Sequence, residues 1–179
     1  MDRLAEAGGD RVGVYDLEAE TGRAIYVHAK VCVVDDVWAM IGSDNFNRRS
    51  WTHDSELSCA ILDLDRDHRD PADPAGHGEG ARTYARNLRL KLWHEHLGPG
   101  LTDEELLDPL QGFDAWRRRA AALDDWHRTG RRGARPPGRV REHRPDPVSG
   151  MTALWARPVH RAMMDPDGRP LRLRRRRAI

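Results

Sequence analysis

The chain has 179 residues, which is enough for one domain with a hydrophobic core. Its composition, 39% hydrophobic and 33% charged, is polar but not extreme, and it holds no run of about 18 apolar residues, so we expect no membrane-spanning helix. The net charge of +1 hides an asymmetry, because residues 129–179 hold fourteen arginines against four acidic residues, a charge of +10, and leave −9 on residues 1–128.

The predicted organisation is therefore an acidic body, residues 1–128, followed by an Arg-rich tail, residues 129–179. The tail favours a partner that carries phosphates, or the acidic face of the body itself, while a solvated, loosely ordered tail is the alternative. The first residues resemble the end of a helix broken by Gly8 and Gly9, which suggests the later part of something larger. No secretory signal is visible, which leaves a cytoplasmic or peripheral membrane location as the expectation.

Strands come first in chain order. Residues 12–17 form a short candidate, and residues 24–34 form the strongest one because β-branched and aromatic residues fill them. Residues 37–41 follow directly after Asp35 and Asp36, so the two strands are predicted to form a hairpin through this pair. Residues 56–62 are continuously apolar, which predicts a central strand covered on both faces. Cys32 and Cys59 lie in these runs, which favours buried free thiols over a disulfide.

Helices follow. Residues 79–97 are predicted to be helical, with Tyr84, Leu88 and Leu92 on the packed face and the arginines largely elsewhere. Thr102 and Glu105 have the spacing of a capping box, which predicts a short helix after it. Residues 113–128 form another helix whose packed face carries Trp116, Ala120 and Leu123. From residue 129 the sequence is turn-like, with an apolar island at 154–159 that we expect to dock through Trp155, and the chain ends in a basic cluster.

The first strand carries the chemistry. Alternation in residues 26–34 places His28, Lys30 and Cys32 on one face, and an adjacent His and Lys do not neutralise each other. An anion between them would remove the cost of burying both, and phosphate suits this role because an imidazole can attack phosphorus or transfer a proton. Ser43 and Asn45 follow the next strand and can donate to the same anion. Glu56 begins the following strand and is predicted to accept from the other ring nitrogen of His28.

The spacing His28-x-Lys30-x-x-x-x-Asp35, followed by Gly42-Ser43-x-Asn45, resembles the HxKxxxxD motif of the phospholipase D superfamily. All signature positions of that motif are present, over about 40 residues. The wider run through Glu56 is similar to phospholipase D proper, bacterial and eukaryotic, more than to the small nucleases. The chain resembles the C-terminal half of a bacterial phospholipase D or cardiolipin synthase-like protein.

The resemblance implies an α/β fold, in which a mixed sheet flanked by helices forms one half of the phospholipase D α/β/α arrangement, with a basic irregular tail. It implies that two motifs form one site, in which one histidine becomes a phosphohistidine and the other protonates the leaving alcohol. His28 would be nucleophile or acid, Lys30, Ser43 and Asn45 would hold phosphate, and Glu56 would orient His28. Asp35 belongs to the motif but is expected to be structural, bonding turn amides. No metal or cofactor takes part, and no Cys/His spacing in the chain supports a zinc site.

This sequence has one such motif where the family uses two. Three explanations stay open: a half inactive alone, a homodimer that builds a complete site, or a chain that needs a separate first half. We expect phospholipase D-type hydrolysis or transphosphatidylation of phospholipids, with the tail on anionic membrane surfaces. The alternatives are a homodimeric single-motif endonuclease, which the negative body charge disfavours, and a truncated non-catalytic half-domain.

Overall fold

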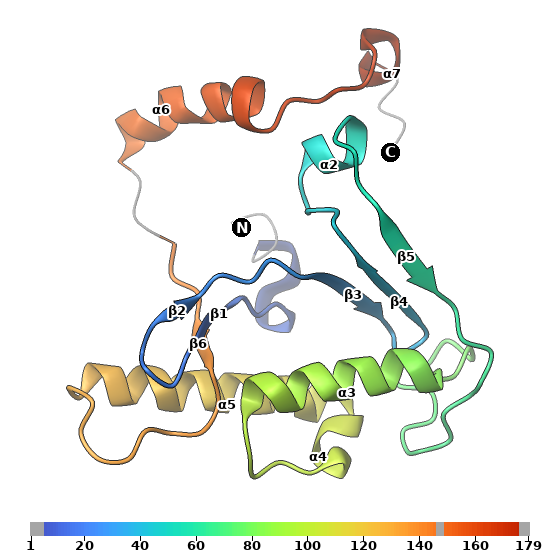
Figure 1. Ribbon diagram of the computed structural model, residues 1–179, viewed down its shortest axis with the longest axis vertical. Helices are drawn as coiled ribbons and strands as arrows, with labels where there is room; N and C mark the ends of the chain where they lie inside the picture. The colour runs from blue at the N-terminus through green and yellow to red at the C-terminus, as the bar shows by residue number, and fades with distance from the viewer. Residues whose placement is uncertain (1–5, 146–148, 176–179) are drawn as a thin grey trace. The chain divides into compact units, whose positions relative to one another are not determined.

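The computed structural model describes residues 6–145 and 149–175, and these residues fall into two compact units. Unit 1 comprises the described residues up to His28, together with residues 33–39 and 61–144. Unit 2 comprises residues 29–32 and 40–60 and the described residues from Pro145 onward. Each unit is described by itself below, and the elements are labelled in Figure 1.

Two three-stranded sheets are present in the described ranges, in the orders β2-β1-β6 and β3-β4-β5. Strand β1 pairs antiparallel with β2 through Leu17 and Ile25, and with β6 through Leu17 and Val140. The strands are β1 Tyr15–Glu18, β2 Ala24–Ile25, β3 Lys30–Val34, β4 Trp38–Gly42, β5 Ser58–Ile61 and β6 Val140–Glu142.

Helices accompany both sheets, which confirms the predicted α/β class with a mixture of strands and helices. Several are only one or two turns long, and the longest is α5. The helical elements are η1 Gly9–Arg11, α2 Arg48–Thr52, α3 Thr83–Leu97, α4 Asp103–Leu107, α5 Pro109–Arg128, α6 Gly150–Val159, the π-helix η2 His160–Met164, and α7 Leu171–Arg175. Among the residues that the structure describes, no helix combines the length and the apolar character needed to cross a membrane.

The core of unit 1 lies between helices α3, α4 and α5 and the sheet that contains β6, which contacts α5 (Figure 1). Its centre is fully buried: Leu97, Leu106, Leu123 and Val140 have no exposed surface. The capping box predicted at Thr102 is present, since the Thr102 hydroxyl accepts from the Glu105 amide and Glu105 accepts from the Thr102 amide. Helix α5 begins at Pro109, four residues earlier than predicted, because Asp108 caps it and proline suits a first helical turn.

Helix α3 packs through a different face from the predicted one. Its buried residues include Arg86 and Arg89, while Tyr84, expected on the packed face, is 40% exposed. The prediction failed because it treated arginine as a surface residue. Both guanidinium groups are buried against carboxylate and carbonyl oxygens. These oxygens accept their hydrogen bonds and balance their charge, which apolar side chains could not do.

The strand predicted over residues 24–34 is interrupted, since β2 ends at Ile25 and β3 begins at Lys30. The two pieces pair in different sheets, so residues 26–29 between them have no ladder partner. The strand predicted over 56–62 is β5, which lies at the edge of its sheet instead of the centre. Cys59 on β5 is therefore exposed, and Cys32 is half-buried, so the prediction of two buried thiols is wrong although both are free.

Part of the predicted tail belongs to unit 1, because β6 pairs with β1 and Val140 is fully buried. The buried carboxylate of Glu18 reinforces this attachment through His127 at 2.9 Å and through Arg135 and Arg141 at 3.5 Å each. Further along, Trp155 on α6 is 62% exposed within unit 2, and its docking onto the body stays a prediction. Residues 176–179 of the terminal basic cluster lie outside the described residues.

Candidate active site

The six predicted site residues divide between the two units. Lys30, Ser43, Asn45 and Glu56 belong to unit 2, and His28 and Asp35 belong to unit 1. The structure thus describes two partial constellations, one around Ser43 and one around the hairpin turn at Asp35. The sequence predicted that the site residues form one site. The placement of His28 toward Glu56 stays a prediction.

Ser43 and Glu56 lie at the centre of the first constellation. The Ser43 hydroxyl donates to Glu56 Oε2 at 2.5 Å and accepts from the Leu57 amide at 3.0 Å. The Ser43 amide donates in turn to the Leu57 carbonyl at 3.0 Å, so the loop after β4 is bonded to the loop before β5. Gly42 allows this close approach, because a Cβ there would lie 1.8 Å from Ser58 Oγ.

The charge of Glu56 is stabilised by its surroundings. The Ser43 hydroxyl, which donates to the carboxylate, is the largest cause of a pKa below the ordinary value, and the positive charges of Lys30 and Arg49 act in the same direction. Glu56 is therefore ionised at neutral pH. A lysine, a hydroxyl and a carboxylate within interaction range make a polar cluster that can hold a phosphate group and accept a proton from a neighbouring donor.

Asn45 lies in a tightly turned loop beside this cluster. Its carbonyl accepts from the Asn47 amide at 2.8 Å and from Trp51 Nε1 at 2.9 Å. Asn47 accepts in turn from the Ser50 amide at 2.9 Å and caps helix α2. The side chain of Asn45 is exposed, as a group that contacts a substrate must be.

His28 is exposed and lies in the segment between β2 and β3. Its ring is 5.8 Å from the ring of Tyr26, measured between centroids. An exposed imidazole is accessible to a substrate phosphorus. Because β3 begins only at Lys30, strand alternation does not fix the direction of the His28 side chain, so the strand argument applied to this residue was wrong.

Asp35 and Asp36 form the turn of the predicted hairpin, which the structure confirms. Both have positive φ, 55° and 56°, and the Val37 amide donates to the Val34 carbonyl at 2.9 Å. This is the two-residue turn that joins tightly twisted antiparallel strands, and aspartate tolerates its left-handed backbone. Asp35 is exposed whereas Asp36 is 2% exposed, so the aspartate with the buried role is not the one in the motif.

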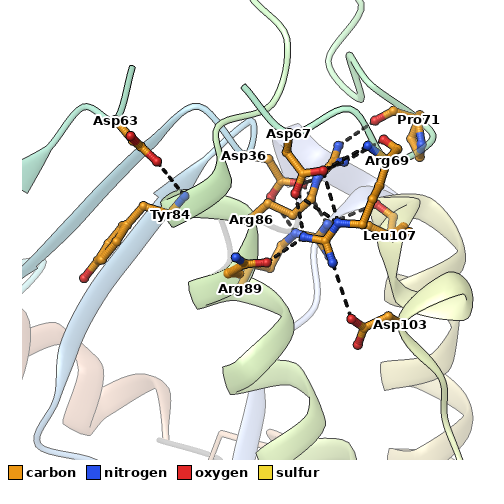
Figure 2. A network of polar contacts seen from close by, with 11 residues as sticks. Asp36, Asp63, Asp67, Arg69, Pro71, Tyr84, Arg86, Arg89, Asp103 and Leu107 are labelled. Carbon is orange, nitrogen blue, oxygen red and sulfur yellow. Dashed lines mark hydrogen bonds and ion pairs between the residues drawn. The ribbon is translucent and has the colours of Figure 1, made fainter. Parts of the chain in front are cut away.

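The buried partners of Asp36 come from helix α3. Arg89 donates to its two carboxylate oxygens at 2.6 Å and 2.7 Å, and Arg86 donates at 3.2 Å (Figure 2). Arg89 also donates to the carbonyls of Leu106 and Leu107, and thereby connects the hairpin turn to helix α4. Sequence reasoning missed this cluster, although an acidic hairpin tip and two arginines three residues apart on one helix were visible signals.

Asp67 and Arg69 extend the cluster toward the loop that precedes α3 (Figure 2). Arg86 lies 3.4 Å from Asp67 and donates to the carbonyls of Arg69 and Pro71. The Arg69 guanidinium hydrogen-bonded to Asp67 lowers the pKa of that carboxyl to about 2. The hairpin turn that follows the motif is thus fixed in unit 1 by buried ion pairs, which are sensitive to the loss of either partner.

Comparison with known proteins gives a family match and several curated relatives. The chain matches the family model described as phospholipase D over residues 7–132. It is 43% identical over 108 residues to phospholipase D C of Dictyostelium discoideum, an alignment that covers 54% of this chain and 6% of that protein. It is 40% identical over 88 residues to phospholipase D alpha 2 of Brassica oleracea var. capitata, covering 48% of this chain and 10% of the relative. Phospholipase D zeta 1 of Arabidopsis thaliana is 39% identical over 90 residues, which are 48% of this chain and 8% of the relative. The chain thus spans a tenth or less of the length of these relatives.

Proposed function

The chain belongs to the phospholipase D family, and on that premise we propose that it supplies one half of a phosphodiesterase site acting on phospholipids. The observation that carries the proposal is the bonded cluster of Ser43 and Glu56 with the charge of Lys30 beside it. Lys30, Ser43 and Asn45 hold the phosphate oxygens, which spreads and stabilises the charge that develops in phosphoryl transfer. Glu56 orients the imidazole of His28, and Asp35 supports the turn.

The reaction uses two histidines, one from each half. A ring nitrogen of the first attacks phosphorus, the bond to the leaving alcohol oxygen breaks, and the imidazolium of the second gives that oxygen its proton. The second imidazole then removes a proton from water or from another alcohol, whose oxygen attacks phosphorus and breaks the phosphorus–nitrogen bond. Hydrolysis and transphosphatidylation differ only in this second nucleophile. His28 is one of the two histidines, and the chemistry needs no metal.

A second copy or a separate chain supplies the other motif. The sheet β3-β4-β5 supports this part of the proposal, because no residue of β3 or β5 is buried in the described structure. Apolar side chains stay exposed on β3 and β4, with Val31 at 37%, Val34 at 44% and Ile41 at 38%. A three-stranded sheet of this size gains stability when its apolar surface is covered. The Arg-rich tail is then available for the anionic membrane that contains the substrate.

The deciding experiment measures choline release from phosphatidylcholine vesicles by the full chain in EDTA, beside plasmid nicking. Light scattering on the same sample records whether the chain is monomeric or dimeric. We expect choline release from a dimer, or from the chain combined with a first-motif half. Plasmid nicking without choline release would favour the homodimeric endonuclease instead. Loss of turnover in EDTA would contradict the metal-independent mechanism.

His28→Ala is the matched chemical control. Because His28 is exposed, we expect the variant to melt at the wild-type temperature while turnover falls to background, a loss of at least about 1,000-fold for a catalytic nucleophile or acid. His77→Ala removes another exposed histidine, in a loop without motif residues, and should keep wild-type turnover. Residual turnover above background in His28→Ala would show that the site is wrongly assigned. A strict monomer without turnover of any diester, with or without a first-motif half, would leave the non-catalytic half-domain.

A further inference from the structure

The segment 165–169 contacts helix α2 although more than 100 residues separate the two in the chain. Asp165 Oδ1 accepts from the Arg49 amide at 2.9 Å, and Asp165 Oδ2 lies 3.3 Å from Arg48 Nε. Arg48 also donates to the carbonyls of Asp165 and Arg161. The Gly168 amide donates to Thr52 Oγ1 at 2.9 Å, at the other end of the same helix. Both ends of α2 are thus held by residues of the predicted tail.

Helix α2 cannot hold itself in place. It has five residues, Arg48–Thr52, and only Ser50 is buried. A helix this short is unstable alone, because nucleation costs more than a single turn of hydrogen bonds returns. Little apolar burial compensates, since Trp51 is 66% exposed. Its position therefore depends on polar contacts at its ends, and Asp165, whose side chain is 17% exposed, supplies one that is shielded from solvent.

The position of α2 in turn affects the candidate active site. Trp51 donates from the helix to the carbonyl of Asn45, the predicted phosphate ligand. Arg49 donates to Asp54 at 3.0 Å, and its charge helps to lower the pKa of Glu56. Contacts from α2 therefore reach Asn45, which precedes the helix, and Asp54, which follows it on the way to Glu56.

Close packing at Gly168 supports a fixed arrangement. A Cβ at that position would lie 2.5 Å from the Cβ of His53, so the segment could not approach α2 with any other residue there. The pKa of Asp165 agrees with tight contacts: partial burial would raise it, but the Arg49 amide and the Arg48 guanidinium lower it overall.

We infer that residues 165–169 clamp helix α2 and thereby position the whole stretch from Asn45 to Glu56, which contains this helix. Asp165 is the positioning residue. This part of the Arg-rich tail is a component of the site and not a solvated appendage. The inference goes beyond the proposed reaction, because it concerns how unit 2 holds the phosphate-binding loop whatever diester the loop receives.

Hydrogen exchange in the full-length chain tests the clamp without any assumption about activity. In Asp165→Ala, amides in residues 45–56 should exchange at least about tenfold faster, because a shielded charge-assisted contact is lost. Asp165→Asn keeps an oxygen for the Arg49 amide and should lie between wild type and Asp165→Ala. Asp125→Asn is the control, because it neutralises an exposed acid on α5, outside the segment, whose ion pair is with Arg128. Unchanged exchange in Asp165→Ala would overturn the inference.

A second measurement separates positioning of the site from mere support of a helix. Titration with inorganic phosphate, followed by NMR, should show affinity reduced about tenfold in Asp165→Ala and unchanged in Asp125→Asn, with equal melting temperatures. Faster exchange with unchanged phosphate affinity would remove Asp165 from the site and leave it a helix support. If wild type binds phosphate but turns over no diester, the proposed function fails while the clamp stands.

Discussion

Ser43 is the residue through which the two loops of the candidate site meet. Its hydroxyl accepts from the Leu57 amide and donates its one proton to Glu56. The amide thus fixes the orientation in which the hydroxyl donates to the carboxylate. The direction matters because a carboxylate that receives a hydrogen bond is stabilised in its charged form. Ser43 therefore acts on Glu56 in the free protein, before any phosphate is bound.

Replacing Ser43 by alanine should raise the pKa of Glu56 toward its ordinary value of 4.5, because the largest stabilising contact to the carboxylate is removed. The measurement is a titration of the Glu56 side-chain carboxyl carbon by NMR. Ser55→Ala removes the exposed neighbouring hydroxyl and serves as the control, with no expected change. A Glu56 titration that is identical in Ser43→Ala and wild type would show that Ser43 is not the main cause and that the Ser50 hydroxyl, Lys30 and Arg49 lower the pKa instead.

Much of this residue-scale detail was accessible from the sequence. The sequence predicted that Lys30 and Ser43 hold an anion and that Glu56 orients His28, and unit 2 contains Lys30, Ser43 and Glu56 together. Their roles stay predictions. The role of Asp36 could not be predicted from the sequence. Its neighbour Asp35 completes the motif, and the pattern does not decide which of two adjacent aspartates is buried. Burial depends on helix α3, which is contributed by a segment 50 residues later.

At the scale of elements, the hairpin of β3 and β4 is attached to α3 through Asp36, whose carboxylate accepts from Arg86 and Arg89 and whose carbonyl accepts from the Arg82 amide. Asp36 is 2% exposed, and the side chain of Arg86 is fully buried. Such ion pairs add little net stability when they are intact, but removing one partner leaves a buried charge without compensation. The turn is therefore the point at which the motif-bearing hairpin is most sensitive to substitution.

Asp36→Asn and Asp35→Asn form a matched pair that tests this attachment. Asparagine tolerates positive φ as well as aspartate does, so neither change strains the turn. Asp36→Asn should lower the free energy of unfolding by about 3–5 kcal/mol because Arg86 and Arg89 lose their charge partner. Asp35→Asn should change it by less than about 0.5 kcal/mol, as expected for an exposed position. Urea denaturation measures both, and equal effects would show that the turn itself, and not the buried pair, sets the cost.

The elements themselves were predictable where local chemistry determines them. The capping box at Thr102, the hairpin turn and the packed face of α5 are each encoded within a few residues. The break after β2 and the edge position of β5 were not, because strand pairing is decided by partners distant in sequence. Strand β6 could not be predicted either. Its three residues have the composition of a basic tail, and they form a strand because β1 pairs with them.

At the scale of the whole molecule, the chain has two units of different construction. Unit 1 has a conventional apolar core and a cluster of buried ion pairs between its hairpin turn and helix α3. In unit 2, the contacts that hold α2 are polar and Ser50 is the one buried residue of that helix. Since unfolding of the whole chain is expected to depend most on unit 1, the charged cluster there should control how the molecule responds to acid.

Asp67 makes that response measurable. Its pKa in the folded state is about 2, against an ordinary value of 3.8, so the carboxylate stabilises the fold at pH values above 3.8. This contribution, about 2 kcal/mol when fully present, is lost as the pH falls from 3.8 toward 2. Asp67→Asn should therefore be less stable than wild type at pH 7, and the difference should shrink through that window. Urea denaturation between pH 7 and pH 2 measures it, with Asp73→Asn, in the same loop, as the control. A difference that stays constant down to pH 2 would mean that Asp67 acts through packing and not through its charge.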